Sequence, residues 1–534
     1  MGIYINPPIT IFNKLATSDH FVDKSKIIEL TNSVLSSDKK YICISRPRRF
    51  GKTLTAKMLC AYYEQGVDNS NIFNNLKIAK SRSYLEDLNK YHVIFVNMTD
   101  EFNSSHRNVD VMLKKLNQRL INELTALYKN IEILELEDLS YTLKTINAHT
   151  GDSFIVIIDE WDCILREASE DFNGIKEYLE WLKLLLKDKD YISLAYMTGI
   201  FPVKKYGTQS ALNMFDEYSM TAPELYAPFI GFTASEVQEL CNIHQMNYDE
   251  MQRWYDGYSF EHEAHVYNPN SVITAVLNKR FANYWTRTET FKTLQQYINL
   301  NFDGLKENIV KLIAGNYVVV TFANFQNDLS SFTSKDDVLT LLIHLGYLAL
   351  VQDPYTIIDT ASQCVVKIPN HEIRSEFVNS LSENKLYAGV YDLINQTNEL
   401  LQNIWAQNNQ KVAELFDKAH SKHTSILKYN DENSLSCVIT LSLLLSNGIY
   451  SVKREMPAGL GFADMVYLPR NGINKPALLI ELKYNASAQS AITQIKNKQY
   501  GNFFEGYQGK VLLIGINYDK HSKKHSCVIE ELVI

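Results

Sequence analysis

The chain has 534 residues, of which 46% are hydrophobic and 21% charged, and its formal net charge is −8. These values are typical of a globular protein of about two to four domains, and they exclude a polycation that wraps nucleic acid along its whole length. The seven cysteines are scattered and never spaced as C-x-x-C, which predicts neither a disulfide framework nor a zinc cluster. The sequence contains no signal-peptide pattern and no run of 18 apolar residues, so we expect a cytoplasmic protein without a membrane partner.

The first motif is Gly51-Lys52-Thr53, which follows an apolar run at 41–44 and opens a helical pattern. A strand, a tight loop and a helix in this order are typical of a phosphate-binding loop, whose backbone N–H groups face the phosphates. Lys52 is then expected to reach the outer phosphates, and the Thr53 hydroxyl to ligate Mg²⁺. Arg46 stands where a Walker sequence has a glycine, so a basic turn that binds nothing in particular is the alternative.

The second motif is an apolar run at 154–158 that ends in Asp159 and Glu160. Such a run predicts a strand buried on both faces, as in a parallel sheet covered by helices. Asp159 would hold Mg²⁺ through water, and Glu160 would polarise an attacking water. For the two carboxylates alone, a helix N-terminus is the alternative; with the Gly-Lys-Thr loop upstream, the pair favours nucleotide binding.

The surrounding pattern alternates strands with helices, at 91–98, 109–129, 141–148, 175–187 and 191–198. We therefore predict an α/β sandwich around a mostly parallel sheet, with ligands at the carboxyl ends of its strands. Thr198 falls at such an end, where it could sense a γ-phosphate or only satisfy the backbone. Arg48 and Arg49 could stabilise phosphate charge during transfer, unless they are solvated or neutralised by acidic neighbours.

Several strings in this order resemble the AAA-ATPase-like family of microbial proteins. The strings are Phe21-Val22-Asp23-Lys24-Ser25, Ser45-Arg46-Pro47-Arg48-Arg49-Phe50-Gly51-Lys52-Thr53, Ile158-Asp159-Glu160-Trp161-Asp162, Met197-Thr198-Gly199-Ile200, Gly231-Phe232-Thr233, Trp254-Tyr255-Asp256-Gly257-Tyr258 and Val266-Tyr267-Asn268-Pro269. The resemblance implies a P-loop NTPase that binds and hydrolyses ATP with Mg²⁺, and the family shows this same loop without the glycine. Many members carry a restriction-endonuclease-like domain at the C-terminus.

The middle of the chain is less informative. Residues 231–290 combine short helical patterns with many aromatic residues, which predicts a small, packed helical lid rather than a platform for stacking bases. Residues 291–400 give a helix at 338–345 and a strand pair around 355–368, and we expect a mixed connecting region. The predicted domains are thus an ATPase core at 1–230, the lid, the connecting region, and a last domain at 401–534.

The last domain is mildly basic, with 15 Lys and Arg against 11 Asp and Glu over residues 401–534. Its pattern is a helix that starts with Asn430-Asp431-Glu432 and ends near 445, strands at 450–455, 462–467 and 477–483, a helix at 486–500, and a strand at 511–516. This order of elements resembles the core of the PD-(D/E)XK nuclease superfamily, and Asp464 with Glu481-Leu482-Lys483 is similar to its signature.

The spacing of the signature has a mechanical reason. Side chains alternate across a strand, so Glu481 and Lys483 share a face, where Asp464 of the neighbouring strand can meet them. Asp464 and Glu481 would bind Mg²⁺, or Mn²⁺ in its place, and Lys483 would orient or activate the water. Glu432 could complete the metal site. Gln494 and Lys498 lie four apart on one helix face and could point to the site or bind nucleic-acid phosphate.

The sequence therefore predicts an ATPase fused to a metal-dependent nuclease that acts on nucleic acid, DNA in the first instance, with ATP gating the nuclease. Chance occurrence of Asp and Glu-x-Lys in strands is the alternative at the second site. Two further alternatives are a C-terminal domain that binds nucleic acid without cutting it, and a nucleotide-switched protein with slow turnover that binds a protein partner. The sequence leaves open a homo-oligomer, the trigger and the pathway.

Overall fold

The computed structural model describes residues 2–135, 137–203, 212–261, 263–285, 290–300, 302–322, 325, 332–351, 362–382, 384, 387–423, 432–458, 461–498, 504 and 507–532. The chain forms two compact units, one of residues 1–287 with 319–373 and one of residues 288–318 with 374–534. The seven cysteines are buried and unpaired. Among the helices in the described ranges, none is long and apolar enough to cross a lipid bilayer.

A fully parallel five-stranded sheet forms the core of the first unit, in the order β2-β3-β4-β1-β5. Its strands are β1 (Tyr41–Ser45), β2 (His92–Asn97), β3 (Phe154–Asp159), β4 (Ile192–Gly199) and β5 (Asp216–Tyr218). Every residue of β1, β3 and β4 is buried, as their continuous apolar sequences require. The sheet class and four of the strands confirm the prediction, whereas β5 has only three partly buried residues and no periodicity that would reveal it.

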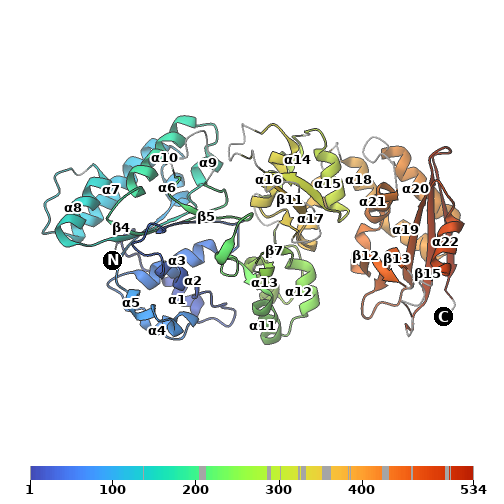
Figure 1. Ribbon diagram of the computed structural model, residues 1–534, viewed down its shortest axis with the longest axis horizontal. Coiled ribbons are helices and arrows are strands. Elements are labelled where there is room, and N and C mark those ends of the chain that lie inside the picture. Colours follow the sequence, from blue (N-terminus) through green and yellow to red (C-terminus); the bar gives the residue numbers. More distant parts are fainter. Residues whose placement is uncertain are drawn as a thin grey trace. The chain divides into compact units, whose positions relative to one another are not determined.

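Helices cover both faces of this sheet (Figure 1). On one face α3 packs against β2, β3 and β4, and the other carries a layer that includes α7, α8 and α10. The latter three helices are capped by Asn108, Asp138 and Asp171. Each of these side chains accepts the backbone N–H of the residue three positions later in the chain. The helices are α1 (Thr10–Ala16), α2 (Ile27–Asn32), α3 (Lys52–Tyr63), α4 (Ser70–Phe73), η1 (Lys77–Lys80), α5 (Tyr84–Asp87), α6 (Met98–Ser104), α7 (Val109–Leu127), α8 (Leu139–Thr150), α9 (Cys163–Glu167), α10 (Phe172–Leu186) and η2 (Glu224–Tyr226).

Two small sheets complete the first unit. The segment predicted as a helical lid holds α11 (Ala234–His244), α12 (Tyr248–Tyr255) and α13 (Pro269–Asn278), but also an antiparallel sheet, β6-β8-β7, of β6 (Phe232–Thr233), β7 (Tyr258–Phe260) and β8 (Glu263–Tyr267). Its aromatic residues are largely core, because Tyr255, Tyr258 and Tyr267 are buried. The other sheet, β10-β11-β9, accompanies α16 (Lys335–His344) and consists of β9 (Val318–Thr321), β10 (Ala349–Leu350) and β11 (Gln363–Lys367). Tyr355, where we expected a strand, lies outside the described residues.

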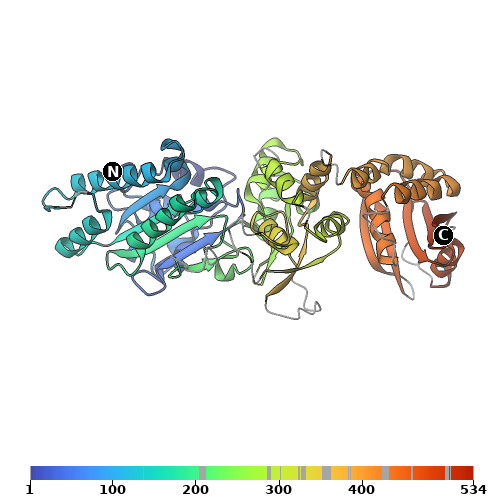
Figure 2. The same ribbon diagram turned by 90° about the horizontal axis from the view of Figure 1, so that it is seen from above.

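The second unit contains a mixed five-stranded sheet in sequential order, β12-β13-β14-β15-β16 (Figure 2). The strands are β12 (Tyr450–Ala458), β13 (Gly461–Pro469), β14 (Ala477–Tyr484), β15 (Val511–Asp519) and β16 (Lys524–Glu531), and only β14 and β15 are parallel. The helix α22 (Ala488–Asn497) makes the crossover between these two. It packs so closely that a Cβ at Gly515 would lie 2.3 Å from the carbonyl oxygen of Ala488.

The remaining helices of the second unit are α14 (Thr290–Ile298), α15 (Leu305–Ile313), α17 (His371–Leu381, whose first residues belong to the first unit), α18 (Ala388–Asn395), α19 (Thr397–Trp405), α20 (Asn409–His423), α21 (Glu432–Ser442) and η5 (Leu444–Gly448). Among them, α20 packs against β16 and α21 against β14. The order helix, three strands, helix, strand confirms the predicted fold of this part, and β16 is a further strand that we did not predict. Asn430, Asp431 and Tyr500, which we expected at helix ends, lie outside the described residues.

Candidate active sites

The loop between β1 and α3 has the predicted order of elements. Gly51 ends the loop with a φ of +89°, a left-handed conformation that residues with a Cβ rarely adopt, and α3 begins at Lys52. The Lys52 ammonium is buried and donates to the carbonyl oxygens of Arg46 and Pro47, both at 2.9 Å, so the side chain lies along the loop. Burial lowers the pKa of Lys52, while the carboxylate of Glu160 opposes that shift.

Arg46, which replaces the Walker glycine, points away from the loop. Its side chain is fully buried and donates to the carbonyl oxygens of Ser45 at 3.1 Å and Tyr218 at 3.0 Å. The guanidinium lies 5.3 Å from the ring centre of Phe260, and burial lowers its pKa to about 9. Arg46 therefore supports β1 from the β5 side and takes no space from a ligand above the loop.

Asp159 and Thr198 form a buried hydrogen-bonded pair at the carboxyl ends of β3 and β4. The Thr198 hydroxyl donates to Asp159 Oδ1 at 2.5 Å, and the Asn97 amide donates to Asp159 Oδ2 at 3.1 Å. Both carboxylate oxygens thus have a partner, and Asp159 has no exposed surface. Thr198 orients Asp159 in this arrangement; roles for the two residues in metal binding and phosphate sensing stay predictions.

Glu160 follows Asp159 in the chain and lies near the Lys52 ammonium of the loop. Its backbone is left-handed, with a φ of +54°, and its Oε2 is 2.7 Å from a guanidinium nitrogen of Arg166 on α9. The Nε of Arg166 is 3.0 Å from Asp162 Oδ2. Burial raises the pKa of Glu160, and the nearby Lys52 ammonium acts against that rise.

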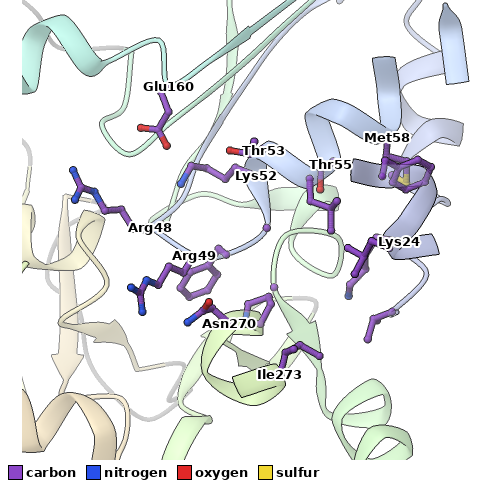
Figure 3. Close-up of a pocket in the computed structure, with 18 of the residues that line it drawn as sticks. Lys24, Arg48, Arg49, Lys52, Thr53, Thr55, Met58, Glu160, Asn270 and Ile273 are labelled. Atoms are coloured by element: carbon purple, nitrogen blue, oxygen red, sulfur yellow. The ribbon is translucent and has the colours of Figure 1, made fainter. Parts of the chain in front are cut away.

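A pocket of about 670 Å³ opens above the loop, which is within the usual range for small-molecule sites. One end is polar, with Lys52, Arg48 and Glu160 directed toward the same space, and the other is apolar, with Met58 and Ile273 (Figure 3). Further lining residues are Phe12, Leu15, Phe21, Val22, Arg49, Gly51, Thr53, Phe229 and Phe232. This combination of a cationic end and an aromatic end suits a phosphate group joined to a flat heterocycle.

Two of the predicted cationic residues differ in their contacts. Arg49 also lines the pocket, but its guanidinium donates to the carbonyl oxygen of Tyr284 at 2.6 Å, so it ties the loop to the segment after α13. Lys24 lines the apolar end and likewise connects distant segments of the chain, because its ammonium contacts Glu236 at 2.5 Å and the carbonyl oxygen of Pro228 at 2.6 Å. Arg48, which is also partly exposed, lines the polar end of the pocket.

The sequence reasoning missed Asn97 and Arg166. Asn97 ends β2 and lies in register with Asp159 of β3, so the carboxyl ends of adjacent parallel strands were the signal that could have found it. Arg166 follows Asp162 by one helical turn, a spacing that favours an ion pair. That it also reaches Glu160 depends on the left-handed turn at Glu160, which no sequence pattern indicates.

In the second unit, the signature residues converge between the sheet and α22. The β13–β14 ladder pairs Met465 with Ile480, which places Asp464 and Glu481 on one face of adjacent strands. Asp464 Oδ2 accepts the backbone N–H of Leu482 at 2.7 Å. The three side chains predicted to meet, those of Asp464, Glu481 and Lys483, are therefore close together on β13 and β14.

Glu481 is a buried carboxylate with an unusual environment. The Gln494 amide and the Lys483 ammonium both contact its Oε1, the latter at 3.4 Å, whereas Oε2 has no hydrogen-bond partner within the described part of the chain. Burial, and then the negative charge of Asp464, raise the pKa of Glu481 to about 7. A buried oxygen without a donor beside a second carboxylate is the donor set that a divalent cation would satisfy.

The remaining predicted residues of this site are less closely placed. Glu432 opens α21 with a half-exposed side chain, and its Oε1 lies 3.4 Å from the Lys483 ammonium. Lys498 is exposed at the end of α22, without a side-chain hydrogen bond or ion pair to any described residue. Nowhere in the described ranges does a group of three or more His, Cys, Asp or Glu residues form a ready metal cage. Mg²⁺ often needs only one or two carboxylates together with substrate phosphates, so Asp464 and Glu481 suffice for that mode.

Comparison with known proteins finds family matches over the two regions that contain these residues. Residues 8–208 match the family described as "Predicted AAA-ATPase", and residues 430–527 match the PD-(D/E)XK nuclease superfamily. An AAA-ATPase-like region is thus followed in one chain by a region similar to PD-(D/E)XK nucleases. The "Uncharacterized protein in vnfD 5'region" of Azotobacter chroococcum mcd 1 is 23% identical over 96% of both chains, so the similarity extends over nearly the whole of each.

Searches of solved structures find more distant likenesses. The Aeropyrum pernix ORC1 protein in complex with DNA is 12% identical, with 70% of this chain and 97% of that chain covered and a TM-score of 0.25. The Aeropyrum pernix ORC2 protein is 11% identical, with 68% and 96% covered and a TM-score of 0.28. Cdc6p from Pyrobaculum aerophilum is 11% identical, with 70% and 98% covered and a TM-score of 0.24. These low scores carry no argument about function.

Proposed function

We propose that the first unit binds and hydrolyses ATP, that the second cleaves phosphodiester bonds of nucleic acid, in the first instance DNA, and that ATP gates this cleavage in the cytoplasm. The AAA-ATPase-like and PD-(D/E)XK nuclease-like matches support the two activities. The observation that carries the proposal is the buried Glu481, whose unpartnered Oε2 lies beside Asp464 on the signature strands.

In the first unit, different parts of the pocket would bind the phosphates, the metal ion, the attacking water and the adenine ring. The loop before α3 and the Lys52 ammonium would hold the outer phosphates, while Thr53 would ligate Mg²⁺ directly and the buried Asp159 would hold it through water. Mg²⁺ would neutralise charge on the phosphates. Glu160, at the polar end of the pocket, would orient the attacking water, and the apolar end would take the adenine ring.

In the nuclease domain, Asp464 and Glu481 would hold Mg²⁺ or Mn²⁺, with Glu432 as a further oxygen ligand. The metal would polarise the scissile phosphate and lower the pKa of a water. Lys483 can orient that water and offset negative charge in the transition state, since its ammonium already lies between Glu481 and Glu432. Gln494 fixes the orientation of Glu481, and the exposed Lys498 would contact nucleic-acid phosphate.

The test is a cleavage assay of the full-length protein on circular and linear, single- and double-stranded DNA, with Mg²⁺ or Mn²⁺ and ATP. We expect metal-dependent cutting that Lys483→Ala abolishes. Lys496→Ala is the matched control, because this lysine lies on α22 and pairs with Glu530 outside the site. The nuclease assignment would be wrong if Lys483→Ala cut as fast as the wild type.

A second candidate function is a nucleotide-switched ATPase whose C-terminal domain binds nucleic acid or a protein without cutting. The half-exposed side chain of Glu432 at the edge of the site favours it. DNA binding that persists in the wild type without any cutting, while ATP turnover is intact and lost in Asp159→Ala, would establish this alternative.

A further inference from the structure

Arg166 connects two carboxylates that differ in how firmly they are held. Asp162 has no exposed surface, and its Oδ2 accepts the backbone N–H groups of Ile200 at 3.0 Å and Phe201 at 2.8 Å, as well as the Arg166 Nε at 3.0 Å. Glu160 is 21% exposed at its side chain, and its Oε2 takes the other end of the same guanidinium at 2.7 Å. The Nε of Arg166 is thus held in the core by Asp162, whereas the terminal nitrogen that contacts Glu160 lies at the pocket.

The pocket end of this ion pair lies where the outer phosphates of a nucleotide would enter. Glu160, Arg166, Lys52 and Thr53 line the same cavity. A phosphate group competes well with a carboxylate for arginine, because it carries more charge and, like a carboxylate, can accept two parallel N–H bonds. A terminal phosphate beside Lys52 would therefore compete with Glu160 for the guanidinium.

We infer that Arg166 is a positioning residue that distinguishes nucleoside triphosphate from diphosphate: it exchanges Glu160 for the terminal phosphate while its Nε stays on Asp162. The exchange releases Glu160, which can then orient the attacking water only when a triphosphate is bound. This inference rests on the proposed function of the same pocket and names the residue that detects the γ-phosphate.

A neighbouring ion pair shows what a purely structural contact on this helix looks like. Arg107 contacts Glu167 at 2.5 Å, but the arginine side chain is 60% exposed and does not line the pocket. Arg166, by contrast, is 9% exposed and lines the polar end. Arg107→Ala is therefore a matched control: it removes an arginine that pairs with the same helix and does not itself line the pocket, although its partner Glu167 does.

The test compares the dissociation constants of a non-hydrolysable ATP analogue and of ADP, each with Mg²⁺, for the full-length wild type, Arg166→Ala, Arg166→Lys and Arg107→Ala. A charge-assisted hydrogen bond contributes enough to change affinity by roughly 10- to 100-fold. We expect Arg166→Ala to weaken the analogue by that factor and ADP by less than about threefold. Arg107→Ala should change neither constant.

Arg166→Lys keeps the charge but cannot bridge Asp162 and Glu160, so it should weaken binding of the analogue by an intermediate factor and leave ADP binding unchanged. This variant also keeps the inference testable if Arg166→Ala fails to fold. Equal losses for the analogue and ADP in both variants would overturn the inference and make Arg166 a structural tie. Absence of nucleotide binding in the wild type would instead overturn the proposed function of the pocket, and the inference with it.

Discussion

The two candidate sites neutralise their buried carboxylates in different ways. In the ATPase domain, Asp159 is hydrogen-bonded through both oxygens and Glu160 is paired with Arg166. In the nuclease domain, Glu481 is equally buried, but its Oε2 has no donor among the described residues and its pKa rises to about 7. Both oxygens of Asp159 thus have a donor, whereas one oxygen of Glu481 has none among the described residues.

The difference indicates which site depends on a ligand for its electrostatic balance. A fully hydrogen-bonded carboxylate such as Asp159 holds its geometry before any ligand arrives, whereas Glu160 stays with Arg166 until a ligand competes for that guanidinium. A buried carboxylate oxygen without a donor, such as Glu481 Oε2, is costly, and a proton or a cation relieves that cost. We therefore expect mutations and pH to affect the nuclease site through cation binding and the ATPase site through geometry.

The largest expected effect comes from removing the unbalanced charge. Glu481→Gln keeps the shape of the side chain but removes the carboxylate, so metal-dependent cleavage should fall by about 10³-fold or to background. Glu530→Gln is the control, because Glu530 is also an α22 contact, through Lys496, but lies outside the site. The measurement is the cleavage rate at saturating Mg²⁺ in the wild type and both variants. An unchanged rate in Glu481→Gln would contradict the assignment of this carboxylate as a metal ligand.

The raised pKa of Glu481 predicts how stability depends on pH without metal. Below the ordinary value of 4.5 the group is protonated in both states, and between 4.5 and about 7 only the unfolded chain ionises. This contribution to stability is therefore full at low pH and lost as pH rises to about 7, by about 3 kcal/mol.

Thermal unfolding in a chelator at pH 5 and pH 8 measures this effect. Glu481→Gln should gain stability relative to the wild type on going to pH 8, and Mg²⁺ should stabilise the wild type more at pH 8 than at pH 5. A difference between variant and wild type that stays the same at both pH values would show that Glu481 ionises normally.

Arg46→Gly restores the Walker glycine and should nevertheless be harmful. The variant loses two hydrogen bonds to carbonyl oxygens and the contact with Phe260, so we expect a destabilisation of about 2 kcal/mol. Because the side chain points away from the pocket, ATP turnover per folded molecule should not improve. A faster turnover in Arg46→Gly would indicate that the arginine obstructs the loop.

The smallest expected effect is at Thr198. Thr198→Val keeps the volume but removes the hydroxyl that donates to Asp159, which leaves a buried carboxylate oxygen unsatisfied at a cost of about 1–3 kcal/mol. Turnover of ATP should fall by about tenfold with little change in the affinity for ADP. Full activity in this variant would mean that Asn97 alone positions Asp159.

The sequence predicts those parts of the sites that depend on local order. Gly51-Lys52-Thr53 follows a strand and opens a helix, and the alternation of Glu481 and Lys483 fixes their common face, so both motifs lie where we expected them. Apolar runs likewise identified β1 to β4. These features can be predicted because each depends only on residues that are close in the sequence.

Other features depend on partners that are distant in the sequence. The orientation of Arg46 is set by Tyr218 and Phe260, and the role of Thr198 by Asp159, none of which a local pattern relates. Arg166 meets Glu160 because of the left-handed backbone at Glu160. The strand β5 is too short for periodicity to reveal it, and the strands β6 and β7 are similarly short.

The central claim is that ATP in the first unit controls cleavage by the second. The most direct measurement is the cleavage rate of the full-length protein with Mg²⁺, with and without ATP, in the wild type, Lys52→Ala and the control Lys57→Ala, which lies on the same helix away from the loop. We predict that ATP changes the wild-type and Lys57→Ala rates by about tenfold and leaves Lys52→Ala unaffected. The same response to ATP in Lys52→Ala, or no response in a wild type that turns ATP over, would contradict the account.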